Sequence, residues 1–467
     1  MSVTRESAGS GRHFLRRLGL LEAIGVSMGG MGPTLAMNLN PQEPSQHVGQ
    51  LIPLIFLLST VLVLMVGWCF ARLSRLHPNA GSAFGFVSAV MGPKSGLVAG
   101  WAMLGAYLCF GMVGISGFGL FRSDLAEKFH PAHHPSVFFF TATGALVVSI
   151  LSITAARRAA LVLVVMEGIA VVVMLTLAAG VIWRVLHGHG PQGDPPIHDL
   201  FIPSAGISPS ALALALSFGF LSFAGFEEVS TLSEEVREPA YTVPRVLLGT
   251  VLVGGIVYTV VTTAEVLGFG TDHAGMERFA TSHSLLGDMA TTFFGAWCGD
   301  LMDILATFSA LGCGLAGVMG ASRVLFAIMR ELAPSSRLAR LSLEGASPVP
   351  ASLCVIGFSF LGYAVMRFPF HGRGSDPFFW SSTIAVLGLL VAYFLVAVSA
   401  GVSVIRAPHP ESRWKLLIPV IASVVIGYTL WVSLYPFQQG AYGVIPWIVL
   451  GWCLIPIVAM LTGLVRR

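Results

Sequence analysis

Long apolar stretches separated by short polar segments dominate the chain. A helix needs about 20 apolar residues to cross the hydrocarbon core of a bilayer, whereas a transmembrane β-barrel shows alternation in segments of about ten residues. Twelve continuous stretches of roughly helix-spanning length lie at residues 17–38, 49–71, 95–121, 136–155, 158–186, 209–234, 244–269, 299–330, 349–366, 378–405, 414–435 and 444–464. The pattern predicts an all-α integral membrane protein with twelve transmembrane helices.

Composition supports contact with a lipid bilayer. Of 467 residues, 55% are hydrophobic and 10% are charged, whereas a soluble domain carries about 25% charged residues. Soluble enzymes and nucleic-acid-binding proteins are excluded on this ground. The 6 cysteines are scattered, with no CxxC pair or metal-ligand spacing. We therefore expect no metal and no cofactor.

The distribution of basic residues predicts the orientation. With the N-terminus placed in the cytoplasm, 20 of the 26 Lys and Arg residues fall on the inside and the other 6 on the outside. Cytoplasmic loops are enriched in Lys and Arg. We expect a multi-pass protein of the cell (inner or plasma) membrane with both termini cytoplasmic.

The first apolar stretch contains an interruption at Gly29-Gly30-Met31-Gly32-Pro33. In a helix interior Gly costs about 1 kcal/mol and Pro about 3 kcal/mol relative to Ala. Small residues also serve close helix packing in membranes, but packing motifs space them four apart, and this cluster is contiguous and ends in proline. The segment predicts a broken helix near the middle of the membrane.

The sixth stretch carries a matching weak point. Gly219, Ser222 and Gly225 interrupt it, and Glu227 and Glu228 follow directly. Two broken helices five spans apart are typical of two inverted five-helix repeats with the binding site between them. Freed N–H groups of the first helix would face a carboxylate, and freed carbonyls would face an ammonium group. An α-amino acid fits this pair of dipoles, and the chemistry is binding, so we expect no enzymatic activity.

Three segments resemble the amino acid–polyamine–organocation (APC) permeases. Residues 220–227, followed by 233–239 and Val243-Pro244-Arg245, are similar to the sixth-helix signature of that superfamily. Residues 75–86 resemble its P-x-A-G-[GS]-x-Y segment, and 321–330 match more weakly. The resemblance implies a LeuT-like fold with helices 1 and 6 broken. Its expected domains are a cytoplasmic tail (1–16), a transport core (17–405) made of repeats at about 17–186 and 209–405, and accessory helices 11 and 12 (406–467).

The resemblance also implies a substrate site at the two breaks. Ser27, Met28, Gly29, Gly30, Met31 and Gly32 would face the substrate carboxylate, and Phe220, Ser222, Phe223, Ala224 and Gly225 the ammonium and side chain. The first break departs from the plain G-[ST]-G of the superfamily, which leaves the carboxylate donors open. Leu221 stands where some arginine and polyamine exchangers have a gating tryptophan, which disfavours a large cationic substrate.

Two intramembrane acids are candidates for ion coupling. Glu227 would be desolvated beside the half-helix ends, which suits a proton carrier and makes it the preferred coupling residue. The alternative is a structural acid that is hydrogen-bonded to the broken backbone of the first helix. Glu167 lies where many relatives of the superfamily carry a lysine whose ammonium group replaces a bound sodium ion. An acid at this position would bind a proton, or would be a ligand for a cation or the substrate amine. The alternative is a hydrogen bond to a polar group on a neighbouring helix. Thr307 and Ser309 would complete a cation site or bond to their own helix. We expect Glu228 to be structural.

An inner gate is predicted at the cytoplasmic rim from Glu235 and Arg237, together with Glu234, Arg323 and Arg330. The alternative is that these are solvated charges of the loops.

The whole pattern predicts a secondary active transporter that imports a neutral or apolar amino acid, coupled to a proton (or to sodium). An amine or polyamine importer or an amino acid exchanger is the alternative within transport. A membrane sensor that does not transport is the alternative from another class, and enzyme motifs such as HExxH and GxSxG are absent from the sequence.

Overall fold

The computed structural model describes residues 16–78, 82–129, 135–153, 156–192, 197–203, 207–342, 347–372, 374–407, 414–435 and 440–462. In these ranges the chain is helical apart from loops and one isolated bridge between Leu18 and Val236. The main helices are α1 (Leu20–Met31), α2 (Pro33–Leu39), α4 (Ile52–Leu76), α6 (Pro93–Phe129), α7 (Val137–Ser152), α8 (Ala156–Arg184), α9 (Pro209–Phe223), α10 (Glu228–Thr231), α11 (Pro239–Phe269), α14 (Ala296–Leu332), α15 (Val349–Arg367), α16 (Asp376–Ile405), α17 (Trp414–Leu434) and α18 (Ala441–Leu461). The predicted tail lies outside the described residues, except for Arg16.

The predicted apolar stretches fold as helices, which confirms the all-helical membrane protein. Within the described ranges, 9 helices are long and apolar enough to cross a membrane. The first, fourth and sixth predicted spans are instead the pair α1 and α2, the 16-residue α7, and α9 followed by α10. The count of twelve spans and the inverted repeat remain predictions.

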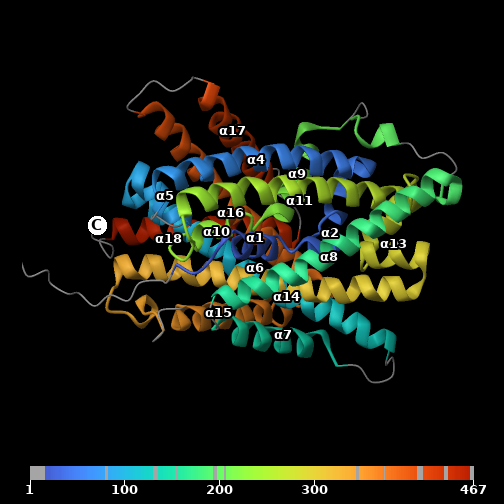
Figure 1. Ribbon diagram of the computed structural model, residues 1–467, viewed down its shortest axis with the longest axis horizontal. Coiled ribbons are helices and arrows are strands. Elements are labelled where there is room, and N and C mark those ends of the chain that lie inside the picture. Colours follow the sequence, from blue (N-terminus) through green and yellow to red (C-terminus); the bar gives the residue numbers. More distant parts are fainter. Residues whose placement is uncertain are drawn as a thin grey trace, which may run out of the picture.

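The helices run mostly along the long axis of the molecule, with α1 and α2 at its centre (Figure 1). Helix α1 packs against α8, α14 and α11, and these contacts enclose it. Around this centre α6 packs on α14 and α16, and α11 packs on α4. The broken segment is therefore held by long, unbroken helices. We call the end at which α1 begins and α18 ends the terminal end, and the other the opposite end.

Both predicted interruptions are present. Helix α1 ends at Gly32, which has a φ of +50°, and Pro33 starts α2 directly after it. Helix α9 ends at Phe223, and Gly225 has a φ of +104° in the turn before α10. Left-handed backbone is accessible to glycine without a Cβ penalty. Gly219 does not break α9: a methyl group there would lie 1.9 Å from Ser59 Oγ, so this glycine serves close helix packing.

Short helices occupy connections that the sequence pattern left as loops: α3 (Gln42–Val48), α5 (Ser82–Met91), α12 (His273–Thr281) and α13 (Leu285–Phe294). The side chains of Asp272 and Ser284 cap α12 and α13 by accepting from the N–H groups of Gly275 and Gly287. These N-cap residues were available as signals, but helices of 9 and 10 residues fall below the length of a membrane span.

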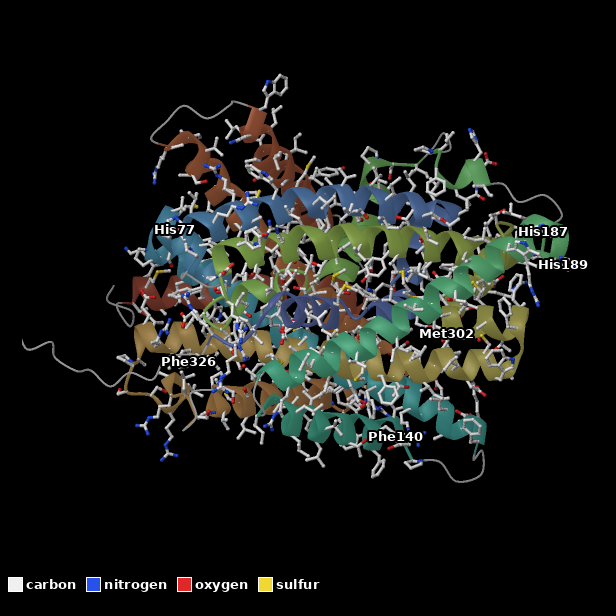
Figure 2. All side chains as sticks on the ribbon, viewed as in Figure 1. His77, Phe140, His187, His189, Met302 and Phe326 are labelled. Carbon is white, nitrogen blue, oxygen red and sulfur yellow. The ribbon has the colours of Figure 1, made fainter. Side chains whose placement is uncertain are left out.

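Polar and apolar side chains are distributed as a bilayer requires. His77 lies at the terminal end of the long axis and His187 and His189 at the opposite end (Figure 2). Large apolar side chains such as Val165, Val172 and Leu361 are exposed on the sides of the bundle, where they would contact lipid.

Candidate functional site

The two broken segments touch each other at the centre of the bundle. A methyl group on Gly225 would lie 2.3 Å from the carbonyl carbon of Gly30 and 2.7 Å from the amide nitrogen of Met31. Ser27 Oγ donates a hydrogen bond to the carbonyl of Phe226 over 2.9 Å. The turn after α9 is thus held directly against the last turn of α1, by contact and by a hydrogen bond.

A second contact joins the far side of the first break to α9. Asn40, directly after α2, donates from Nδ2 to Ser222 Oγ over 2.9 Å, and Ser222 Oγ donates to the carbonyl of Phe218. Phe223 makes an edge contact with Tyr258 of α11, with ring centroids 5.1 Å apart. These two predicted site residues therefore connect α9 to its neighbours.

A small cavity of about 20 Å³ lies beside the breaks. It is lined by Gly30, Met31, Leu35, Ala36, Asn40, Phe110, Val113, Leu221, Cys313, Phe378 and Ser382. This volume holds about one water molecule, so the structure has a closed centre that must widen to admit an amino acid. Its walls are apolar except for Asn40 and Ser382.

The predicted site residues cluster around this cavity but do not all line it. Gly30 and Met31 form part of the wall, and the other predicted residues of both segments are buried behind it or pack on neighbouring helices, apart from the partly exposed Met28. Gly29 faces Leu163 of α8, and Gly32 faces Cys313 of α14. Sequence reasoning missed the wall residues of α6 and α16, because one apolar residue in a membrane helix resembles the next; only the polar Asn40 and Ser382 offered a signal.

Glu167 takes part in a chain of hydrogen bonds that reaches the start of α2. The amide of Leu35 donates to Ser309 Oγ over 3.3 Å, and Ser309 Oγ donates to Glu167 Oε2 over 3.2 Å. Glu167 is buried, and its Oε1 has no hydrogen-bond partner among the described residues. Thr307, in contrast, bonds to the Asp303 carbonyl of its own helix. The chain places a carboxyl within two hydrogen bonds of the first break.

Glu227 accepts hydrogen bonds from three elements. Tyr107 of α6 donates to Oε1 over 2.9 Å, Tyr393 of α16 donates to Oε2 over 2.7 Å, and the amide of Gly225 donates to Oε2 over 3.1 Å. All three side chains are buried. The carboxyl therefore ties the turn after α9 to two scaffold helices. Sequence analysis chose Glu227 but not the two tyrosines.

Ion pairs and backbone bonds close the terminal end. Arg323 Nε donates to Glu235 Oε1 over 2.6 Å in a buried pair, and the exposed pair of Arg330 and Glu234 lies nearby at 2.8 Å. Burial raises the pKa of the Glu235 carboxyl, and the Arg323 guanidinium opposes that rise. Arg237 contributes through its backbone, whose N–H donates to the carbonyl of Leu18. The segment before α1 is thereby bonded to residues 235–237.

A vestibule of about 370 Å³ lies beside these pairs. Its walls include Ser82 and Ser88 of α5, Thr231 of α10, Glu234, and Arg323 and Arg330 of α14. Apolar residues such as Phe84 and Val324 complete its walls. Because charged side chains line it at the terminal end, water would enter it.

The opposite end is closed by a separate polar network. Lys128 of α6 donates to Asp303 of α14 over 2.6 Å, and Ser284 Oγ lies 2.6 Å from Asp303 Oδ1 and 2.7 Å from Asn38 Oδ1. The amide of Leu286 donates to the same Asn38 oxygen. Because Asn38 belongs to α2, this network connects the second half of the first broken helix to α13, α14 and α6.

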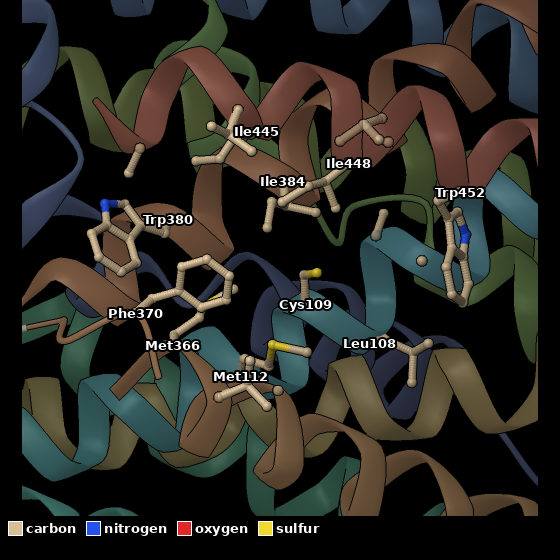
Figure 3. A pocket seen from close by; sticks show the side chains of 18 of the residues that line it. Leu108, Cys109, Met112, Met366, Phe370, Trp380, Ile384, Ile445, Ile448 and Trp452 are labelled. Atoms are coloured by element: carbon tan, nitrogen blue, oxygen red, sulfur yellow. The ribbon is translucent and has the colours of Figure 1, made fainter. Parts of the chain in front are cut away.

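A larger cavity lies away from the breaks. It measures about 610 Å³ between α6, α15, α16 and α18 (Figure 3). Met112, Phe370, Trp380 and Trp452 are among its walls, and no charged side chain lines it. Because it has neither a donor cluster for a carboxylate nor an acid for an ammonium, it does not suit an amino acid.

Comparison with known proteins decides the family. The sequence profile of a family described as amino acid permease matches residues 18–459. The chain belongs to the amino acid permease family. Permeases of this family fall in the APC superfamily, which confirms the resemblance seen in the sequence.

Three relatives illustrate the range of this family. The chain is 27% identical to an uncharacterized transporter of Mycobacterium tuberculosis, with 89% of this chain and 86% of that protein covered. It is 23% identical to the branched-chain amino acid permease BcaP of Lactococcus lactis, with 90% of each chain covered. It is also 25% identical to the low-affinity putrescine importer PlaP of Escherichia coli, over 60% of this chain and 59% of that protein. The protein is therefore a membrane transporter of a permease family.

Proposed function

We propose that this permease imports a neutral, apolar amino acid by alternating access, coupled to a proton. The observation that carries the proposal is the contact between Gly225 and Gly30 at two helix breaks in the centre of the bundle. Irregular backbone at membrane depth is tolerated only where it is buried in protein or lines a cavity. A site made from such ends suits a ligand that carries both a carboxylate and an ammonium group.

The wall chemistry favours an apolar side chain on the substrate. Leu35, Phe110, Leu221 and Phe378 line the central cavity, and no charged side chain belongs to its wall. A second ammonium group, as in a diamine, would be desolvated there without an acidic partner, which is costly. An aliphatic side chain would lose no hydrogen bond on entering the same wall.

Coupling is assigned to the buried acids at the breaks. Glu167 is linked through Ser309 to the start of α2, and Glu227 is bonded to the turn after α9. A proton gained or lost at either carboxyl would change the hydrogen bonds that hold a broken segment. Both segments would have to move when the site opens to one side. By the same reasoning, the Glu235–Arg323 pair and the backbone bond of Arg237 act as an inner gate.

The test is transport by the purified protein in proteoliposomes. Radiolabelled L-leucine should exchange in counterflow, and an inside-alkaline pH gradient should drive its accumulation until a protonophore removes the gradient. Gly168→Ala provides a control variant, since a methyl group there would have no described heavy atom within 4 Å apart from its chain neighbours and the nearby backbone of its own helix. The proposal would be refuted if none of the twenty amino acids bound to the protein or was exchanged by it. Accumulation that ignores the pH gradient would refute proton coupling.

An amine importer is the second candidate. It is favoured by the similarity to a putrescine importer and by Glu227 and Glu228 behind the cavity, which are buried carboxyls. Competition of labelled leucine uptake by a panel of amino acids and of putrescine, cadaverine and spermidine separates the two. Inhibition by the amines alone would select the amine importer.

A further inference from the structure

Two adjacent acids at the second break have different surroundings. Glu227 accepts three hydrogen bonds, from Tyr107, Tyr393 and the amide of Gly225. Glu228, the first residue of α10, is equally buried. Yet its Oε1 atom has no hydrogen-bond partner in the part of the chain that the structure describes. The carboxyl that sequence reasoning treated as structural is thus the less satisfied of the two.

Glu228 occupies a slot between two glycines. A methyl group on Gly30 of α1 would lie 2.6 Å from Glu228 Oε2, and one on Gly320 of α14 would lie 3.3 Å from Glu228 Oε1. Any larger residue at either position would meet the carboxyl. The slot exists because α1 and α14 each have a glycine opposite the Glu228 carboxyl. Through Gly30, Glu228 is in close contact with the first break.

The size of the slot limits what Glu228 can bind. A methyl carbon added to Gly30 would lie 2.6 Å from Glu228 Oε2, and it would stand about 1.5 Å from Gly30 Cα, so Gly30 Cα lies within about 4.1 Å of that oxygen. An ammonium nitrogen between them would need about 2.8 Å to the oxygen and more than about 3 Å to the carbon, so it does not fit. A metal cation needs several oxygen ligands around it, and the slot walls are two glycine faces. A proton needs no such volume. It also removes the cost of burying a charge that lacks its hydrogen bonds.

The groups that face Glu228 make its charge still more costly. They are Glu227 on its own segment, Tyr107 of α6, and Cys313 and Arg323 of α14. Of these only Arg323 is a cation, and it already donates to Glu235 and to the carbonyl of Met319. Two neighbouring carboxyls rarely both ionise. Three donors stabilise charge on Glu227. Glu228 is aided by the backbone amide of Gly320, and its Oε1 has no hydrogen-bond partner among the described residues.

We propose that Glu228 binds the transported proton, whereas Glu227 is a permanent acceptor that positions the turn after α9. This assignment rests on the proposed function, but it moves the proton-binding role from Glu167 and Glu227 to Glu228. The proton occupies Glu228 while Gly30 and Gly320 enclose it. When α1 moves away from α14, the slot opens and water replaces the glycine contact.

The short helix α10 separates Glu228 from the vestibule, and we place the route of proton release along it. Thr231 donates from Oγ1 to the carbonyl of Glu228 over 2.8 Å and forms part of the vestibule wall at the terminal end. Opening the slot on that side connects Glu228 to vestibule water. Charge on Glu228 would then be solvated and would face Arg323. Release of the proton is thereby tied to the movement that opens the terminal end.

The test compares Glu228→Gln with wild type in proteoliposomes, with radiolabelled L-leucine as the probe. Glutamine keeps the shape of the side chain but cannot carry a transported proton. Counterflow without a pH gradient should stay within about twofold of wild type. Accumulation under an inside-alkaline gradient should fall to the level without a gradient, whereas one proton per substrate gives wild type about tenfold accumulation per pH unit.

Matched variants separate this role from a structural one. Glu265 of α11 is another buried carboxyl, and neither of its oxygens has a hydrogen-bond partner within the described ranges. Glu265→Gln should leave accumulation intact. Glu228→Asp keeps a group that can be protonated and should retain accumulation, which decides the question if Glu228→Gln does not fold.

The outcomes distinguish the assignment of Glu228 from the proposed function. Accumulation by Glu228→Gln at the wild-type level, or loss of its counterflow as well in folded protein, overturns the assignment. So does loss of accumulation in Glu228→Asp with its counterflow intact. Wild-type protein that shows no leucine counterflow refutes the proposed function instead.

Discussion

Replacing Gly225 with alanine tests whether contact between the two helix breaks is essential. Gly225 has a φ of +104°, and its missing Cβ would lie 2.3 Å from the carbonyl carbon of Gly30. Real Cβ contacts stay at 3.0 Å or more, so the breaks must separate by at least 0.7 Å (3.0 minus 2.3). The atoms in the way are backbone, so a side-chain rotation cannot relieve the overlap.

The cost follows from two physical effects. Left-handed backbone costs a residue with a Cβ about 1–2 kcal/mol, and overpacking costs about 1–3 kcal/mol. Their sum is roughly 2–5 kcal/mol. The separation also stretches the 2.9 Å bond from Ser27 Oγ to the Phe226 carbonyl. We expect a lower melting temperature and loss of most leucine counterflow.

The assay is thermal unfolding in detergent followed by counterflow in proteoliposomes. Gly168→Ala is the matched control: it adds the same methyl group to a helix position where nothing described lies within 4 Å apart from the chain neighbours and the nearby backbone of that helix. Alanine is favoured over glycine in a helix interior by about 1 kcal/mol, so the control should be as stable as wild type or slightly more so. Wild-type stability and counterflow in Gly225→Ala would refute the reasoning.

The remaining predictions concern buried polar groups. Ser27→Ala removes the donor to the buried Phe226 carbonyl, and we expect the free energy of unfolding to fall by about 1–3 kcal/mol. An unchanged melting temperature would show that this bond does not hold the breaks together. Arg323→Ala leaves Glu235 buried without its partner and should cost about 3–5 kcal/mol. Arg330→Ala breaks an exposed pair and should cost less than about 1 kcal/mol. Equal shifts in the two arginine variants, measured by thermal unfolding, would contradict this contrast.

The identity of the membrane helices follows from the sequence because their signal is local. A stretch such as residues 378–405 must be helical in lipid, since only a helix satisfies every backbone group within the segment, and α16 covers Asp376–Ile405. The break at Gly32 is also local, because Pro33 cannot continue the hydrogen bonds of α1. Fold class, the positions of the long apolar helices and the first break were therefore predictable.

The partners of the buried groups could not be predicted in this way. Ser27 and Phe226 are 199 residues apart, and Glu227 and Tyr393 are 166 apart. In a chain that is 55% hydrophobic, helix periodicity does not tell which face of α6 or α16 meets the site. The sequence alone determined where the long apolar helices lie and where two segments break. Only the tertiary structure decided that Glu227 has three donors and that Glu228 lies in a slot of glycines, because a carboxyl's environment is set by helices that are distant in the chain.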